Sequence, residues 1–288
     1  MINYLNGEFL PDEDTRIPIS DRGLLYGDGF FETIRMHNGQ PFRWKRHAER
    51  LERAHKALRI PFAIDLTTFH QVLEKLSRLN NQPESIARLH VTRGSGSRGY
   101  SPLRAGPPTV LVTTHPLGLQ HFPEQIEFWT LITARSVRLP APNLLSDFKH
   151  ANRLLQIMAR MEADDQGAGD ALVLDHLGAV AETSSANLFW VRDETVHTPP
   201  LDTGALPGVM RSVVIELCMT AGLKLFETRI GPEGLAQVQS VFLSLSSRGI
   251  VAVSQVDASP IPCSPVTHQL HEAYQRQLEL ECPITAIS

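Results

Sequence analysis

The sequence predicts an α+β protein, with mixed α/β order of elements, that is built from two domains. Strand and helix patterns alternate in both halves of the chain without a regular βαβ period. A short loop-like stretch, 116–123, lies near the middle and reads as a linker. We therefore expect a smaller N-terminal α/β domain over 1–115 and a larger C-terminal domain over 124–288, a division that 288 residues allow.

Turn signals and apolar spacing predict the elements of the first half. Asn6-Gly7 and Asn38-Gly39 are pairs that favour type I′ turns, so each predicts a hairpin. Apolar residues recur every three or four positions in two later stretches, as in amphipathic helices. The predicted helices are Trp44–Leu58 and Thr67–Leu79, and the predicted hairpin and strand segments are Ile2–Leu10, Phe30–Met36, Pro41–Arg43, Ile86–Thr92 and Thr109–Thr114.

The second half continues the alternation. It predicts a strand over Ile126–Ala134, a proline-rich loop and a helix over roughly Ala151–Ala163. Two strands flank the turn at His176-Leu177-Gly178, and a strand over Asn187–Val191 follows. The next helix begins near Gly208.

Composition and charge exclude several classes of protein. The chain is 42% apolar and 20% charged, which is typical of a globular protein, and its formal charge of −4 gives no attraction to nucleic acid. No apolar run approaches the roughly 18 residues of a membrane span. The N-terminus lacks the basic start and apolar segment of a secretory signal. We expect a cytoplasmic protein that binds neither nucleic acid nor membrane.

The cysteines and histidines predict no metal site. The three cysteines are scattered and form no Cys-x-x-Cys pair. His47 and His55 lie eight positions apart on one predicted helix, farther than the four-residue spacing that lets two imidazoles share a metal. The string Gly94–Gly99 matches Gly-x-Gly-x-x-Gly, but prolines follow it where a dinucleotide site needs a helix, so it predicts a loop.

Four separated segments carry unusual local chemistry. Lys149 comes directly before an apolar-periodic helix, where it is placed to enter a cleft as a Schiff-base lysine; a solvated lysine is the alternative. Glu182 falls at the end of an apolar strand, where a carboxylate is costly without a cationic partner such as a protonated pyridine; a strand terminus that faces water is the alternative.

The other two segments suit an anion. Leu206–Arg211 places Pro and Gly before a helix, which leaves backbone N–H groups free at its positive end, although an ordinary helix start has the same pattern. Arg50 flanks the apolar stripe of its predicted helix, within reach of a phosphate, and a surface arginine is the alternative.

Together and in this order, these segments resemble the class IV aminotransferase family, the fold-type IV pyridoxal-phosphate enzymes. The resemblance covers nearly the whole chain and rests on Asp21–Glu32, Arg50, Lys149, Glu182–Asn187 and Leu206–Arg211. It implies a two-domain α/β fold, usually a homodimer, with pyridoxal 5'-phosphate between the domains.

The resemblance also implies a role for each residue. Lys149 would bind the cofactor covalently and carry protons, and Glu182 would partner the pyridine nitrogen. The residues implied to hold the phosphate are Arg50, the N–H groups of Val209 and Met210, and Ser246. The region of Ser246 departs from the family, because Arg248-Gly249 stands where an Ala-Glu-type pair is common in the transaminases.

Within the family, the sequence is most similar to the 4-amino-4-deoxychorismate lyases. Leu154 stands where the branched-chain enzymes have a tyrosine. The D-amino-acid enzymes hold the substrate carboxylate with an Arg-x-His pair, and here the matching residues are Arg98 and Tyr100. Both Lys149–Arg153 and Gly94–Ser101 resemble the lyases most closely.

This resemblance implies a reaction in folate precursor synthesis. The enzyme would convert 4-amino-4-deoxychorismate to 4-aminobenzoate and pyruvate through an external aldimine, while Arg98 and Tyr100 bind a carboxylate of this small-molecule substrate. Two alternatives stay open: a D-amino-acid-type or other class IV aminotransferase, and a binding protein of the same fold without activity. The presence of both Lys149 and Glu182 argues against the last.

Overall fold

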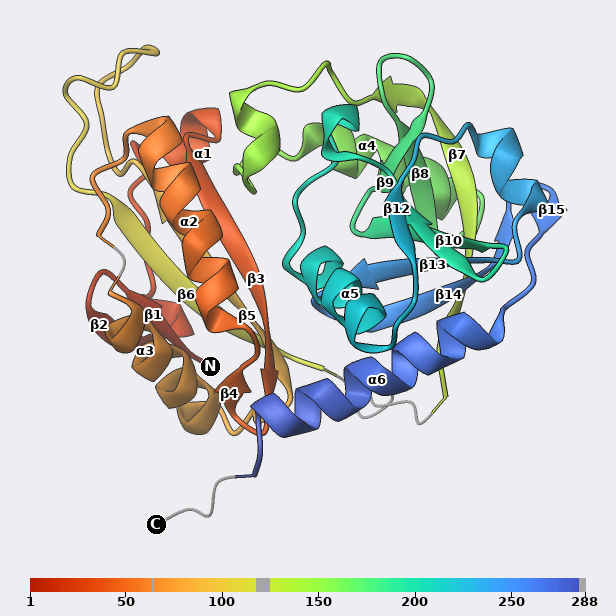
Figure 1. The fold of residues 1–288 in the computed structure, drawn as a ribbon. Helices are drawn as coiled ribbons and strands as arrows, with labels where there is room; N and C mark the ends of the chain where they lie inside the picture. Colours follow the sequence, from red (N-terminus) through yellow and green to blue (C-terminus); the bar gives the residue numbers. More distant parts are fainter. Residues whose placement is uncertain (64, 118–124, 285–288) are drawn as a thin grey trace. The chain divides into compact units, whose positions relative to one another are not determined.

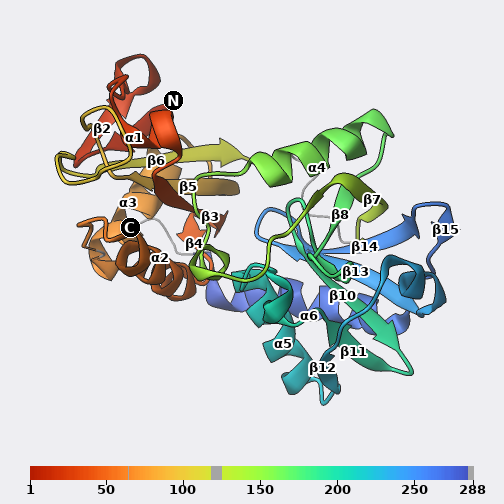
Figure 2. The same cartoon turned by 90° about the horizontal axis from the view of Figure 1, so that it is seen from above.

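A computed structural model describes residues 1–63, 65–117 and 125–284 of the chain, which form two compact units (Figures 1 and 2). The first unit contains the described residues of Met1–Leu119, Asp147–Asn152 and Leu278–Ser288. The second contains those of Gln120–Ser146 and Arg153–Gln277.

The units differ in one respect from the domains expected from the sequence. Asp147–Asn152 and the end of the chain after Gln277 were expected in the C-terminal domain, and they belong to the first unit. Most of the expected linker, 118–123, lies outside the described residues.

An antiparallel sheet of six strands forms the frame of the first unit. Its strand order is β2-β1-β6-β5-β3-β4. The strands are β1 (Ile2–Leu5), β2 (Glu8–Pro11), β3 (Gly29–His37), β4 (Gln40–Pro41), β5 (Ser85–Thr92) and β6 (Thr109–Pro116). Tight turns join β1 to β2 and β3 to β4, with φ of 48° and 106° at Asn6 and Gly7 and of 51° and 77° at Asn38 and Gly39. Positive φ at both central residues is typical of type I′ turns, so both predicted hairpins are confirmed.

Two long helices cover one face of this sheet (Figure 1). They are α2 (Trp44–Leu58) and α3 (Leu66–Leu79), and a short α1 (Arg22–Tyr26) precedes β3. Side chains of β3 such as Phe30 and Ile34 pack with Leu51 of α2 and Leu73 of α3 in one apolar core. Phe148, from the distant segment of this unit, completes the same core. The periodicity therefore predicted α2 correctly and α3 to within one residue.

A mixed sheet of nine strands forms the frame of the second unit. Eight strands follow the order β12-β11-β10-β13-β14-β7-β8-β9, β15 pairs with β14, and β7 runs parallel to both of its neighbours. The strands are β7 (Phe128–Arg138), β8 (Asp170–Leu174), β9 (Val180–Thr183), β10 (Asn187–Arg192), β11 (Thr195–Thr198), β12 (Leu225–Glu227), β13 (Ser240–Leu245), β14 (Gly249–Val256) and β15 (Ser259–Pro260).

Helices α4 (Leu154–Asp165) and α5 (Val209–Thr220) lie against this sheet, α4 along β7 and β8 (Figure 2) and α5 near β13. Helix α6 (Pro265–Glu281) belongs to this unit up to Gln277. The sequence analysis did not predict α6 or the strands from β11 onward.

Helix α4 differs from its prediction in two ways. It begins at Leu154, three residues after the predicted start, because the N–H of Ala151 donates to the carbonyl of Gly29 and holds that backbone extended. Its apolar stripe is also open to solvent, since Leu154, Ile157, Met158 and Met161 are between 44% and 64% exposed. Within the described part of the chain, no helix has the length and apolar character needed to cross a membrane.

Candidate active site

The backbone around Lys149 pairs with β3 of the first unit. The N–H of Phe31 donates to the carbonyl of Lys149 (2.9 Å), and the N–H of Ala151 donates to Gly29 (2.8 Å). Phe30 and His150 form an antiparallel bridge between these two bonds. Backbone hydrogen bonds on both sides of this bridge therefore hold Lys149 against β3.

The Lys149 side chain lies over an aromatic ring that it shares with an arginine. Its Nζ is 5.2 Å from the centroid of Phe31, and the guanidinium carbon of Arg88 is 4.0 Å from the same centroid. The ring of His90 lies 5.8 Å from that of Phe31. Burial and the charge of Arg88 lower the pKa of His90 to about 4, so this imidazole is neutral at pH 7.

Arg50 is buried in a charged triad rather than exposed on its helix. Its Nε and Nη2 donate to the two carboxylate oxygens of Glu32 at 2.6 and 2.7 Å, and Nδ1 of His47 lies 2.7 Å from Oε2 of Glu32. All three side chains are buried. Burial alone would raise the pKa of Glu32, but Arg50 and His47 outweigh it and lower the pKa to about 2.

The imidazole of His47 responds in the opposite direction. Burial lowers its pKa, Glu32 opposes this change, and the charges of Arg50 and Lys149 lower the pKa further. The triad therefore contains one anion, one cation and a neutral imidazole, and Glu32 fixes the orientation of the Arg50 guanidinium.

Arg98 and Tyr100 lie on an exposed loop that one arginine anchors from beneath. Arg22, which is buried, donates through Nη1 to the carbonyl of Gly99 (2.8 Å) and through Nη2 to that of Tyr100 (3.0 Å). The Tyr26 hydroxyl accepts from the N–H of Gly99 (3.0 Å). The side chains of Arg98 and Tyr100 are exposed, the latter to 88%, and the Tyr100 ring lies edge-on to that of Tyr26 with centroids 5.7 Å apart.

Glu182 is buried near the end of β9 in the second unit, only 8% exposed. Its Oε2 accepts from the N–H of Leu206 (2.9 Å), and Nδ2 of Asn187 donates to the carbonyl of the same Leu206 (2.9 Å). The strand end therefore presents a fixed carboxylate and does not turn it into water. Such a group suits a cationic partner.

The start of α5 offers free backbone donors. Gly208 caps the helix without a side-chain hydrogen bond, and the first N–H groups of a helix, here those of Val209 and Met210, have no partner within the helix. A Cβ at Gly208 would lie 2.0 Å from Oδ1 of Asn187, so a larger residue there would have to displace the Asn187 side chain. Such an end, with its positive dipole, suits a phosphate.

Ser246 follows β13 in the turn that leads to β14, and it is half-buried. Arg248 in the same turn, which marks the departure from the family pattern, donates from Nη1 to Oε1 of Glu127 at 2.8 Å. This ion pair gives Arg248 a structural partner.

The predicted residues thus fall into two groups. Lys149, Arg50, Arg98 and Tyr100 belong to the first unit, and Glu182, Val209, Met210 and Ser246 belong to the second. The sequence analysis missed Glu32, His47 and Arg88 as members of the first group. The alternation of β5, in which Ala87 and Leu89 face the core, was the available signal for Arg88 on the opposite face.

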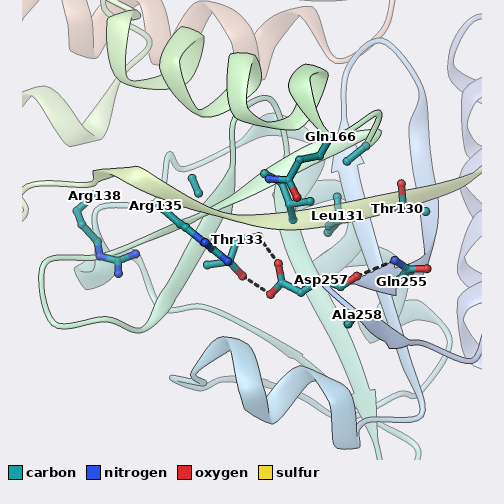
Figure 3. Close-up of a pocket in the computed structure, with 12 residues that line it drawn as sticks. Thr130, Leu131, Thr133, Arg135, Arg138, Gln166, Gln255, Asp257 and Ala258 are labelled. Carbon is teal, nitrogen blue, oxygen red and sulfur yellow. Dashed lines mark hydrogen bonds between the residues drawn. The ribbon is translucent and has the colours of Figure 1, made fainter.

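A separate pocket of about 680 Å³ in the second unit contains none of these residues (Figure 3). It opens where β7 leaves β14 and shifts register against β8, and Asp257 accepts from the N–H and hydroxyl of Thr133 at its base. Among residues 1–63, 65–117 and 125–284, no cluster of His, Cys, Asp or Glu could hold a metal ion.

Comparison with known proteins gives one family. The model of the family described as "Amino-transferase class IV" matches residues 29–256. An aminodeoxychorismate lyase of Vibrio harveyi is 34% identical over 256 residues, which cover 88% of this chain and 91% of that protein. The solved 4-amino-4-deoxychorismate lyase from Pseudomonas aeruginosa has a TM-score of 0.81 and 32% identity, and covers 98% of this chain and 100% of its own.

A branched-chain enzyme is as similar in structure. The branched-chain amino acid aminotransferase of T.th., solved with pyridoxamine 5'-phosphate, has a TM-score of 0.89 and 30% identity, and covers 98% of this chain and 95% of its own. The lyases and the aminotransferases therefore share both the fold and much of the sequence with this chain.

Proposed function

We propose that this chain, which belongs to the class IV aminotransferase family, is a 4-amino-4-deoxychorismate lyase. The family uses pyridoxal phosphate, and the fold is its mixed α and β fold. The proposed reaction converts 4-amino-4-deoxychorismate to 4-aminobenzoate and pyruvate, which would place the enzyme in folate precursor synthesis. The proposal includes the expected cytoplasmic location.

The residues fit this cofactor when each group is tested alone. A helix end capped by Gly208 suits the phosphate, a buried carboxylate suits the protonated ring nitrogen, and a lysine held by β3 suits the aldehyde. When bound, pyridoxal phosphate supplies an aldehyde that captures an amine and a ring that accepts electrons. We assign the phosphate to Val209, Met210, Arg50 and Ser246, and the ring nitrogen to Glu182.

The observation that carries the proposal is the second cation on the Phe31 ring over which Lys149 lies. Arg88 stacks on the same Phe31 ring as Lys149, and the exposed Arg98 lies on the anchored loop of this unit. Guanidinium groups favour a substrate that has carboxylates besides its amine, because each can form two hydrogen bonds to one carboxylate. The lyase substrate has two carboxylates, whereas a branched-chain amino acid has one and an apolar side chain.

The proposed mechanism uses Lys149 as the proton carrier. With the substrate amine bound, Nζ would remove the proton from the ring carbon that bears this amine, and the bond from the ring to the enolpyruvyl oxygen would break. Nζ then returns a proton to the methylene carbon of the departing enolpyruvate, which becomes pyruvate. Aromatisation of the ring drives the step, and Arg98 and Tyr100 hold a carboxylate throughout.

The direct test incubates the cofactor-loaded protein with 4-amino-4-deoxychorismate generated in situ and measures both products. We expect equal amounts of 4-aminobenzoate and pyruvate over many turnovers. Lys149→Ala should abolish them, and borohydride reduction followed by peptide mapping should place the cofactor on Lys149 in the unaltered protein. Arg98→Ala should raise KM about tenfold with a smaller change in kcat, since its role is in binding.

Matched measurements separate the alternatives. Arg104→Ala removes another exposed arginine of the same loop and should leave KM unchanged. If the loaded protein instead forms glutamate from 2-oxoglutarate with branched-chain or D-amino acids and releases no 4-aminobenzoate, it is an aminotransferase. This is the second candidate, which the similarity to the branched-chain aminotransferase structure favours.

The proposed assembly is a homodimer. Four exposed apolar side chains form a stripe on α4, whereas exposed apolar residues are usually scattered singly over a surface. The stripe suits a second copy of the chain, and its residues are Leu154, Ile157, Met158 and Met161. Light scattering should give twice the mass of one chain. The double variant Met158→Lys with Met161→Lys should give the mass of a single chain.

A further inference from the structure

A second buried carboxylate lies close in sequence to Glu182 and has no cation. Asp170 is the first residue of β8 and is fully buried. It forms no ion pair with a described residue, and hydroxyl groups satisfy it instead. Thr183 Oγ1 and Ser185 Oγ each donate to Oδ2 at 2.7 Å, Ser184 Oγ donates to Oδ1, and the N–H of Ala171 donates to Oδ1 at 2.7 Å.

These hydroxyl groups belong to the turn that joins β9 to β10. Thr183 ends β9 directly after Glu182, and Asn187 begins β10. Thr183 Oγ1 also accepts from the N–H of Ala186 (3.0 Å), which closes the turn on itself. Asp170 therefore fixes the backbone on which Glu182 and Asn187 stand, one on each side of the turn.

Glu182 and Asn187 in turn hold one peptide segment. The N–H of Leu206 donates to Glu182, its carbonyl accepts from Asn187, and both bonds are 2.9 Å long. Two residues later, Gly208 packs against Oδ1 of Asn187 and caps α5. A continuous set of hydrogen bonds and contacts thus connects Asp170 to the first turn of α5.

We propose that Asp170 is a positioning residue that holds Glu182 and the N-terminal end of α5 at a fixed separation. The inference rests on the proposed roles of these two groups, one toward the ring nitrogen and the other toward the phosphate. A short methylene–oxygen arm joins the ring and the phosphate of the cofactor, so two anchors bind both groups well only when their spacing is set beforehand. A carboxylate saturated by hydroxyl groups sets this spacing without adding a cation near Glu182.

A purely structural role for Asp170 predicts a different result, and Asp175 provides the matched control. Asp175 is also fully buried and follows the other end of β8, but it accepts from the N–H groups of Leu177 and Ala179 and pairs with Arg229 at 2.5 Å. Asp170→Asn and Asp175→Asn therefore each remove a buried carboxylate from the same hairpin, and only the first lies next to the Glu182 turn.

The experiment measures binding of pyridoxal phosphate to the apoprotein and the 31P resonance of the bound phosphate, without substrate. We expect Asp170→Asn to weaken binding about tenfold, because it loses hydrogen bonds to a charged group. We also expect it to shift the 31P resonance. Asp175→Asn should lower the melting temperature and change neither measurement. Because no substrate is present, the result does not depend on whether the enzyme is a lyase or an aminotransferase.

A pair of milder variants covers the case in which Asp170→Asn does not fold. Thr183→Val removes the hydroxyl that bonds to Asp170 and keeps the shape of the side chain, and Thr183→Ser keeps the hydroxyl. We expect weaker binding of pyridoxal phosphate and a shifted 31P resonance in Thr183→Val. In Thr183→Ser, both should match those of the unaltered protein. Unchanged binding and resonance in Thr183→Val, or equal losses in Asp170→Asn and Asp175→Asn, would overturn the proposal.

Discussion

Glu32 shows how strongly one buried carboxylate depends on its partners. It lies on the face of β3 that also bears Phe30 and Ile34, so α2 covers it completely. An isolated charge there would be very costly, but two bonds from Arg50 and one from His47 satisfy its oxygens. The same bonds orient Arg50, so the stability of the first unit and the position of a proposed phosphate ligand rest on one residue.

We expect Glu32→Gln to lower the free energy of unfolding by about 3–5 kcal/mol at pH 7, because it leaves the Arg50 guanidinium buried without a counter-charge. Urea denaturation of the apoprotein measures this change. The control is Glu52→Gln on the exposed face of α2, which breaks the surface pair with Lys56 (3.0 Å) and should cost about 0.5 kcal/mol or less. Equal effects of the two variants would show that the buried triad has no special weight.

The pH dependence of the same difference is a second prediction. The pKa of Glu32 in the folded protein is about 2, below the ordinary 4.5, so the ionised group stabilises the fold above pH 4.5 and this stabilisation is lost as the pH falls toward 2. The gap in unfolding free energy between the unaltered protein and Glu32→Gln should therefore be constant near neutral pH and shrink below about pH 4.5. A gap that grows on acidification would contradict the assignment.

At the scale of elements, the glycine-rich loop depends on a residue outside it. Arg22, on the short helix α1, binds two loop carbonyls and forms an ion pair with Asp28 at 2.8 Å. Asp28 also pairs with Arg93, which precedes the loop. Burial would raise the pKa of Asp28, but the two arginines outweigh it and lower it, so the anchor stays charged at neutral pH.

We predict that Arg22→Lys releases this loop, because an ammonium group cannot reproduce the planar fork that reaches two carbonyls. Hydrogen exchange of a peptide that contains residues 99–101 should become about tenfold faster, the effect of losing about one charged hydrogen bond. Arg104→Lys, on the same loop but exposed, should leave the exchange rate unchanged. No change in Arg22→Lys would show that other contacts fix the loop.

The elements that the sequence predicted well have strong local signals. The two Asn-Gly turns need positive φ at both residues, and the apolar period of α2 matches the face buried against β3. After Met219, β13 and β14 are buried at nearly every position and so show no apolar–polar alternation. Helix α6 has polar residues over much of its length, which hides its apolar period. The apolar stripe of α4 was recognised, but an apolar pattern does not show which surface packs against it. In the single chain this stripe is exposed to solvent.

The site divides in the same way. Lys149, Glu182 and the start of α5 could be proposed from the sequence because each is chemically unusual in its local sequence. Glu32, Arg88 and Asp170 were missed because their partners lie on other elements. Thr183 is 13 residues from Asp170 and Arg50 is 18 from Glu32, and the Phe31 ring under Arg88 is farther along the chain still. Only the assembled sheets bring these side chains together.

At the scale of the whole molecule, the first unit contains the end of the chain as well as its beginning. His37, at the end of β3, lies 3.1 Å from Glu84 through Nδ1 and 3.1 Å from Glu279 through Nε2. Asn38 donates to the carbonyl of Cys282 at 2.9 Å. Burial would lower the pKa of His37, but the two carboxylates outweigh it and raise the pKa.

This arrangement predicts that the attachment of the C-terminal residues weakens in base. A raised pKa means that protonated His37 stabilises the fold fully below its ordinary pKa of 6.5, and that this contribution is lost as the pH rises through the higher folded value. The unaltered protein should therefore exceed His37→Gln in unfolding free energy by more at pH 6 than at pH 9. A difference that increases toward pH 9 would contradict the ion pairs.

The backbone pairing of Lys149 with β3 limits how the gene can be divided into fragments that each encode a whole unit. A gene fragment that ended at residue 117 would encode the six-stranded sheet and both of its covering helices, and it would still lack the lysine, the Phe148 of its core and the residues from Leu278. The first unit is one compact body, but three separate segments of the gene encode it. No single continuous gene segment encodes the first unit alone. A recombination event that transfers all of it must also transfer the second unit.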